Sequence, residues 1–229
     1  TEEMTNLVNA SAVHFLNFEE LLESKFFEKN LKTFVLPNGV DLNELGITSL
    51  DNYDLKSNHY TYMLFLGRLS PKKGFDILIP AFKEALESCP GLKLLIAGPD
   101  QFNYKSEIIN LLIKYGIKES SSFLGMLEGS EKSNAFRKSD FFILPSYQEG
   151  DSVAVKEAMA FGLPVIITPS CHLNEVTKNN AGFVVQPNID SIKNAIIQLY
   201  SNKSIRKNMG FNAKELIHKN YIWKILVVK

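Results

Sequence analysis

The feature that most constrains this chain is an alternation, from Tyr60 to Val185, of short β-rich runs with longer segments of helical period. Such alternation is typical of βαβ units packed on a parallel sheet. The predicted strands are Tyr60 to Leu66, Leu92 to Ala97, Ser122 to Leu124, Phe141 to Leu144, Val165 to Thr168 and Gly182 to Val185. The sequence therefore predicts an α/β fold with a parallel sheet that carries helices on both faces.

Helices are predicted between these strands and after the last one. From Phe75 to Ser88, apolar residues recur at i, i+3, i+4 and i+7, which gives a stripe that faces the sheet. The segment from Ile108 to Ile113 repeats this pattern. Two further helices are predicted near the end, from Ile189 to Tyr200 and from Ser204 to Lys219. Together with the strands they predict one complete domain over residues 59–229.

The first 36 residues do not continue the alternation. They predict a strand from Ala12 to Leu16, an amphipathic helix from Phe18 to Glu28 and a short strand from Thr33 to Leu36. So few elements cannot bury a core of their own, so residues 1–36 are interpreted as the remnant of a preceding N-terminal domain. Residues 37–58, rich in Asn, Asp and Ser, are interpreted as an interdomain linker. The chain does not begin with Met, which fits an excised fragment.

Composition excludes several classes of partner and site. Lys and Arg number 25, as do Asp and Glu, so no excess positive charge is available to hold nucleic acid. Cys89 and Cys171 are far apart and lack CxxC spacing, which indicates neither a disulfide framework nor a zinc site. The longest apolar runs are strand-sized, and the amino end has no signal-peptide pattern. The expected location is a reducing cytoplasm.

Basic residues follow the first predicted strand of the sheet, where a parallel α/β fold binds its ligands. The loop runs from Gly67 to Gly74, and it carries Arg68 and Lys73 beside the start of a helix. Two cations beside a helix N-terminus suit a diphosphate, because the side-chain charges and the helix dipole act together. The alternative is a solvated basic turn. Gly98 opens a second tight turn at the same edge of the sheet.

The loop after the fourth strand carries a pair of acids. Glu149 precedes a helix that ends near Phe161, and Glu157 lies inside that helix, eight positions later. Asp151 or Ser152 is expected to cap the helix, so that the free amides of Gly150 to Val153 point toward the sheet edge. Carboxylates hold vicinal hydroxyls well, since each offers two acceptor oxygens. The alternative for each glutamate alone is a solvated surface acid.

These residues resemble a known family. The run Glu-Gly-x6-Glu-Ala-Met-Ala-x-Gly-x-Pro-Val, preceded by Pro-Ser, is similar to the E-x7-E signature of the retaining glycosyltransferases of family 4. The resemblance extends over roughly Val35 to Lys219 in the family's order, through the segments Pro37 to Asp41, Gly67 to Gly74, Phe123 to Gly125, Asn174 to Val176 and Ala181 to Val184. It implies the carboxy-terminal, Rossmann-like donor-binding domain of a GT-B enzyme.

The resemblance also implies a role for each site residue. Arg68 and Lys73 would bind the donor diphosphate and act catalytically, by stabilising charge on the departing nucleotide. Glu149 would lie at the transferred sugar, and Glu157 would hold the ribose hydroxyls. The remaining donor-binding residues implied by the resemblance are Gly67, Gly98, Gly125, Met126, Gly150, Asp151, Ser152 and Val153. No metal or other cofactor is expected.

The implied reaction transfers a sugar, with retention, from a UDP- or GDP-sugar to an acceptor glycan or lipid-linked glycan, as in polysaccharide or glycolipid synthesis. Acceptor contacts and any peripheral membrane contact would belong to the missing N-terminal domain, so the fragment alone is expected to transfer little. Asp151 stands where many family members carry an aromatic or small apolar residue, which leaves the donor sugar open. The alternatives are a nucleotide-sugar epimerase of the same fold and a non-catalytic interaction module.

Overall fold

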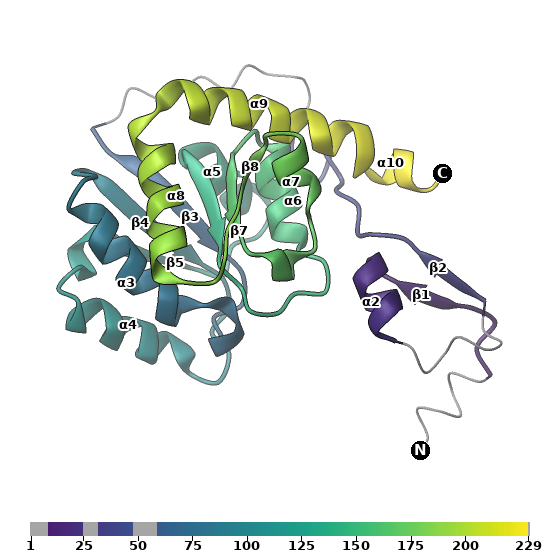
Figure 1. Ribbon diagram of the computed structural model, residues 1–229, viewed down its shortest axis with the longest axis horizontal. Helices are drawn as coiled ribbons and strands as arrows, with labels where there is room; N and C mark the ends of the chain where they lie inside the picture. Colours follow the sequence, from purple (N-terminus) through teal and green to yellow (C-terminus); the bar gives the residue numbers. More distant parts are fainter. Residues whose placement is uncertain (1–8, 25–31, 48–58, 229) are drawn as a thin grey trace.

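A computed structural model describes residues 9–24, 32–47 and 59–228, and its largest part is a twisted six-stranded sheet (Figure 1). Every neighbouring pair of these strands is parallel, in the order β5-β4-β3-β6-β7-β8. The strands are β3 (Thr61–Leu66), β4 (Leu92–Ala97), β5 (Ser121–Gly125), β6 (Phe141–Leu144), β7 (Val165–Ile167) and β8 (Gly182–Val184). The predicted α/β fold is confirmed, and no predicted strand end is off by more than one residue.

Helices cover both faces of the sheet. Helices α3, α4 and α8 pack together on one face, whereas α5, α6 and α9 cover the other (Figure 1). The main helices are α3 (Phe75–Leu86), α4 (Tyr104–Lys114), α5 (Gly129–Lys138), α6 (Val153–Ala160), α8 (Ile189–Ser201) and α9 (Lys203–Asn220). Three short 3-10 turns and two four-residue helices complete this part, namely η2 (Pro71–Lys73), η3 (Lys118–Ser120), η4 (Pro169–Cys171), α7 (Glu175–Lys178) and α10 (Trp223–Leu226).

The strand order reverses direction beside β3, and this reversal determines where a ligand can bind. From β3 the chain moves outward through β4 to β5, and it then crosses back to β6 on the other side of β3. Right-handed crossovers therefore place the first connecting helices on one face and the later ones on the other. The loops after β3 and β6 diverge at this point, and ligands of open α/β sheets bind in the crevice that such a reversal leaves.

The amino-terminal residues form a small separate unit, called here the N-terminal segment (residues 9–24 and 32–36). Strands β1 (Val13–Phe15) and β2 (Thr33–Val35) pair in parallel, and α2 (Phe18–Glu23) follows β1. Helix α2 has no buried residue, so it contributes little apolar packing. The three predicted elements are all present, although residues 25–28 of the predicted helix lie outside the described residues.

The residues after the N-terminal segment pack onto the sheet domain more closely than a polar linker would. Val40 and Leu45 are both buried, and the Val40 N–H donates to the Tyr221 carbonyl at 2.8 Å. Val40 and Ile222 thereby form a parallel bridge. Residues 48–58 of the predicted linker lie outside the described residues. The first part of the linker is thus joined to the carboxy-terminal end of the chain. None of the helices in the described ranges has the length and apolar character needed to span a bilayer.

Candidate functional site

A pocket of about 630 Å³ lies at the carboxyl edge of the sheet, beside the reversal of strand order. Its walls come from the loops that follow β3, β4 and β6. Three cationic side chains, Arg68, Lys72 and Lys73, share this lining with the carboxylate of Glu149. Because the cations outnumber the acid, the pocket favours an anionic ligand. The sequence analysis predicted three of these four residues and did not single out Lys72.

The basic loop after β3 is fixed against the loop after β6. Its 3-10 turn begins at Pro71, whose ring presets the backbone, and ends at Gly74 with φ of +73°. A Cβ atom at Gly74 would overlap the Pro145 carbonyl oxygen, so only glycine permits this close approach. The Lys72 carbonyl accepts hydrogen bonds from the Tyr147 N–H at 2.8 Å and from the Ser146 hydroxyl at 2.9 Å. The two loops therefore form one rigid wall of the pocket.

Lys73 and Glu149 form an ion pair across these two loops. The Lys73 Nζ lies 2.5 Å from the Glu149 Oε1, and both side chains are largely shielded from water. A charge-assisted hydrogen bond that is shielded from water is stronger than one on the exposed surface, because water screens the charges less. An anion that enters the pocket would share Lys73 with Glu149. The pair thus links the cation predicted for a diphosphate to the acid predicted for the sugar.

Glu157 lies apart from this pair, one turn into α6, and it is not among the residues that line the 630 Å³ pocket. Its Oε1 lies 2.7 Å from the Nζ of Lys132 on α5, and the residue is buried. Sequence reasoning missed Lys132, because 25 residues separate it from Glu157 and only the tertiary fold brings the two together. Each of the two predicted acids is therefore paired with one lysine.

Three of the four predicted glycines, Gly67, Gly98 and Gly125, lie side by side at the ends of β3, β4 and β5. The Gly98 N–H donates to the Gly125 carbonyl at 2.7 Å. Gly98 has φ of +133°, and a Cβ atom there would overlap the carbonyl of Gly67, so the backbones approach too closely for any side chain. Met126 follows Gly125 and is 62% exposed. These residues build the rim of the sheet rather than supply charge.

The residues from Gly150 to Val153 form the entry to α6. Ser152 occupies the N-cap position, as predicted, but its side chain makes no capping hydrogen bond. The Asp151 carboxylate binds Lys156 and the backbone N–H of Asn38 instead. The prediction of a side-chain cap is therefore wrong in its chemistry, because the Asp151 carboxylate binds the Lys156 ammonium and the Asn38 N–H rather than the free amides at the start of α6. Gly150 lines the pocket together with Glu149, and Val153 is exposed.

Lys156 is a third residue that the sequence analysis did not single out, after Lys72 and Lys132. It is 1% exposed and, together with its neighbour Glu157, interrupts the otherwise apolar residues of α6. A lysine buried to this extent requires charged or polar partners, and the only sign of burial in the sequence was the apolar residues on either side of the Lys156-Glu157 pair in α6. Across the described ranges, no group of three His, Cys, Asp or Glu side chains is placed to hold a metal ion.

The comparisons with known proteins agree with this geometry. A model of the family described as "Glycosyl transferases group 1" matches residues 49–216. An uncharacterized glycosyltransferase of Methanocaldococcus jannaschii is 31% identical over 163 residues, which cover 70% of this chain and 41% of that protein. The GDP-mannose-dependent monoacylated alpha-(1-6)-phosphatidylinositol monomannoside mannosyltransferase of Corynebacterium glutamicum is 29% identical over 168 residues, 70% of this chain and 43% of that protein.

A solved structure shows the same fold. Anabaena HepE, crystallised with UDP and glucose, superposes with a TM-score of 0.81 at 22% identity, over 95% of this chain and 61% of that one. The chain thus spans less than half the length of the two curated relatives. The sheet matches the carboxy-terminal, Rossmann-like domain of the GT-B fold, as the sequence predicted. By the match over residues 49–216, the chain belongs to the group 1 glycosyl transferases.

Proposed function

We propose that this chain is the donor-binding half of a retaining glycosyltransferase that uses a nucleoside-diphosphate sugar. The observation that carries the proposal is the pocket that Arg68, Lys72 and Lys73 line together with Glu149, whose carboxylate is paired with Lys73. A site of this composition offers charge to a diphosphate and oxygen acceptors to sugar hydroxyls within one cavity. Its position at the reversal of strand order is the usual ligand position of an open α/β sheet.

Each side chain has a distinct chemical task in this proposal. Arg68 and Lys73 hold the diphosphate and stabilise the negative charge that builds on the nucleotide as the sugar departs. Glu149 and the amides of Gly150 to Val153 hold the sugar, and Glu157 binds the ribose hydroxyls. The ion pair of Lys73 with Glu149 keeps both groups aligned at the cavity wall.

The nucleotide base and the acceptor are left open. One relative is named for its dependence on GDP-mannose, whereas HepE was crystallised with UDP and glucose, so both nucleotides are to be tested. The proposed acceptor is a glycan or lipid-linked glycan, in polysaccharide or glycolipid synthesis at the cytoplasmic side of a membrane. Its contacts would lie in the part of the protein that precedes this domain.

The test is titration calorimetry of UDP and GDP into the complete protein that contains this chain. Arg68→Ala is expected to weaken nucleotide binding by about 10- to 100-fold, because the variant loses a charge-assisted hydrogen bond to the diphosphate. Glu157→Gln, which keeps the side-chain shape, is expected to weaken binding in the same direction. Lys83→Gln is the matched control, because its lysine lies on the outside of α3 in an exposed pair with Glu87.

Two results would count against the proposal. If neither UDP nor GDP binds to the intact protein, the proposed function is wrong. If the Arg68→Ala variant binds nucleotide as tightly as the control does, the assignment of the nucleotide to this pocket is wrong. Incubation of a bound sugar nucleotide without an acceptor separates transfer from epimerisation. A changed sugar configuration on the recovered nucleotide would identify an epimerase of the same fold.

A further inference from the structure

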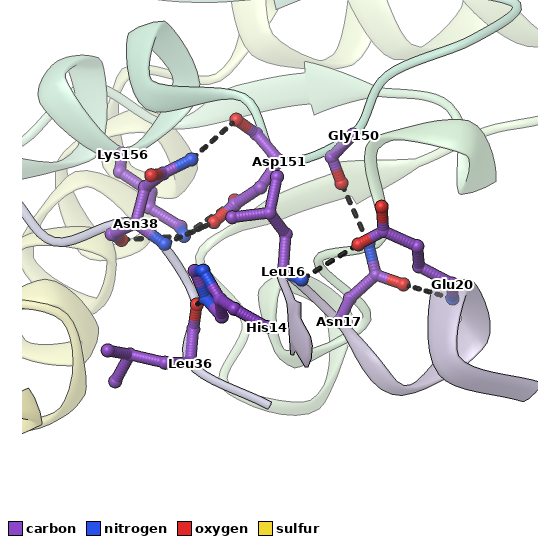
Figure 2. A network of polar contacts seen from close by, with 9 residues as sticks. All are labelled: His14, Leu16, Asn17, Glu20, Leu36, Asn38, Gly150, Asp151 and Lys156. Carbon is purple, nitrogen blue, oxygen red and sulfur yellow. Dashed lines mark hydrogen bonds and ion pairs between the residues drawn. The ribbon is translucent and has the colours of Figure 1, made fainter. Parts of the chain in front are cut away.

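The loop before α6, called here the donor loop (residues 149–152), is tied to the amino-terminal part of the chain on its outer side. Figure 2 shows the network: Asn17 of the N-terminal segment points at Gly150, and Asn38 of the linker lies between Asp151 and Lys156. The Asn17 Nδ2 donates to the Gly150 carbonyl at 2.7 Å. Residues more than one hundred positions away in sequence therefore hold the loop that carries Glu149.

Lys156 is the buried centre of this network. Its Nζ lies 2.6 Å from the Asp151 carboxylate and donates to the Asn38 carbonyl at 2.9 Å. The same ammonium lies 4.7 Å from the centroid of the Tyr221 ring, within the range of a cation–π contact. Burial lowers the pKa of Lys156, and the Asp151 carboxylate opposes that change. A buried charge with so many partners fixes their relative positions.

The Asp151–Lys156 pair holds both backbone groups of Asn38. The Asn38 N–H donates to the Asp151 Oδ2 at 2.6 Å, and the Asn38 carbonyl accepts from Lys156. Gly39 follows directly, and a Cβ atom there would overlap the indole of Trp223. At Asn38 and Gly39 the linker therefore contacts the donor loop and α6 on one side and Trp223 of α10 on the other.

Asn17 acts on the loop from the N-terminal segment. Its Oδ1 caps α2 by accepting from the Glu20 N–H, while the Glu20 carboxylate accepts from the Leu16 N–H. This arrangement differs from a capping box in that the Glu20 carboxylate accepts from Leu16 rather than from the N-cap residue Asn17, but it likewise ties the Asn17 amide to the first turn of α2. The Nδ2 of the same amide then fixes the Gly150 carbonyl. Because the peptide is planar and trans, fixing that carbonyl also fixes the direction of the Asp151 N–H.

We propose that Asn17, Asp151 and Lys156 are positioning residues: they set the donor loop relative to the linker and the N-terminal segment, so that Glu149 and the loop amides meet the sugar correctly. This inference rests on the proposed function. Asp151 then acts through Asn38 and Lys156, and its carboxylate is not a direct partner of the sugar. The nucleotide is held by Arg68, Lys73 and Glu157, none of which bonds to Asn17, Asn38, Asp151 or Lys156; Lys73 meets the donor loop only through Glu149. Loss of the network should therefore lower the rate of sugar transfer without lowering the affinity for the nucleotide.

The test compares Asp151→Asn with the control Lys193→Met in the complete protein. Asp151→Asn keeps the side-chain shape and removes the charge that faces Lys156. Lys193→Met removes an ion pair of similar geometry, since Lys193 binds both Glu84 and Asp190 on the far helices α3 and α8. Three quantities are measured for each variant: amide hydrogen exchange of the peptide that contains Asn38, nucleotide affinity by calorimetry, and kcat for transfer.

For Asp151→Asn, hydrogen exchange at Asn38 is expected to rise at least 10-fold, nucleotide affinity to stay within about twofold, and kcat to fall at least 10-fold. A purely structural loss would instead lower the calorimetric stoichiometry, because fewer molecules would be folded. Lys193→Met is expected to change none of the three quantities. Unchanged exchange at Asn38 would show that the network is not formed, and faster exchange with unchanged kcat would show that it does not position the loop.

A second variant, Asn17→Asp, serves if Asp151→Asn fails to fold. It keeps an oxygen to cap α2 and replaces the N–H that reaches Gly150 with a carboxylate oxygen, so helix α2 is retained and the hydrogen bond to the loop becomes a repulsion between two oxygens. A fall in kcat of at least threefold with unchanged nucleotide affinity is expected, and an unchanged kcat would overturn the proposal. If wild-type protein binds neither nucleotide, the proposed function fails, yet the exchange measurement still reports on the network.

Discussion

The sheet domain and the N-terminal segment are held in place by different forces. Every residue of the central strand β6 is buried, whereas α2 buries none and leaves Phe18 68% exposed. The segment reaches the donor loop through directional contacts instead, such as the one from Asn17 to Gly150. Apolar burial stabilises more strongly and does not depend on direction, while hydrogen bonds contribute less free energy and specify geometry. Apolar packing therefore sets where the rim of the pocket lies, and polar contacts set how the segment meets it.

The largest expected difference between the two regions is in the cost of removing an aromatic ring. Phe142 is fully buried in β6, so Phe142→Ala should lower the free energy of unfolding by about 3–5 kcal/mol. Phe18→Ala should change it by less than about 0.5 kcal/mol, because that ring already lies in water. Urea denaturation measures both. Equal losses would show that the segment is part of the same apolar core.

A smaller difference in the free energy of unfolding is expected between alanine substitutions at two glycines, Gly98 and Gly150. Gly98→Ala places a side chain at φ of +133° and against the Gly67 carbonyl, which should cost at least about 1–3 kcal/mol. Gly150→Ala is expected to be close to neutral for stability, since the nearest atom to the added carbon, the Cδ1 of Leu16, lies at 3.4 Å. Thermal unfolding of the two variants checks this order. A destabilised Gly150→Ala would mean that the segment presses on the donor loop.

The smallest expected effect is a loss of stability at alkaline pH, which we assign to Tyr147 of the sheet domain. Partial desolvation, with a hydrogen bond to Asp76, raises the pKa of Tyr147 to about 12, although the residue is 42% exposed. The unfolded chain releases this proton near pH 10, whereas the folded chain keeps it, so stability should fall as pH rises from about 10 to 12. Tyr147→Phe should flatten that fall in a series of urea titrations. An identical slope in both proteins would exclude Tyr147 as its source.

The sheet could be predicted because its signal is local. Phe141 to Leu144 is a continuous apolar run, and the observed strand has the same bounds. The loops that carry Arg68, Lys73 and Glu149 follow from the same reasoning, because each comes directly after a buried strand. Parallel strands bring these loops to one edge of the sheet.

Partners between distant elements could not be predicted in this way. Lys132 meets Glu157 only because α5 crosses back over the sheet to β6, and its own helix is too polar to show a strong pattern. Lys156 and Asp151 are five positions apart, which is not a helical pairing distance, and they meet because the chain turns at Ser152. The commitment of Asp151 to Asn38 depends on the placement of the linker, which no spacing along the chain specifies.

The bridge between Val40 and Ile222 joins the linker to the carboxy-terminal end of the sheet domain. The polypeptide enters the domain and reaches its last helix at the same place, so both passages share one narrow joint. A body attached in this way can pivot as a unit about that joint without stretching its own backbone. Rotation there would move the wall formed by Glu149 as one piece with the strands behind it, and it would break the hydrogen bond from Asn17 to Gly150 that ties the donor loop to the N-terminal segment.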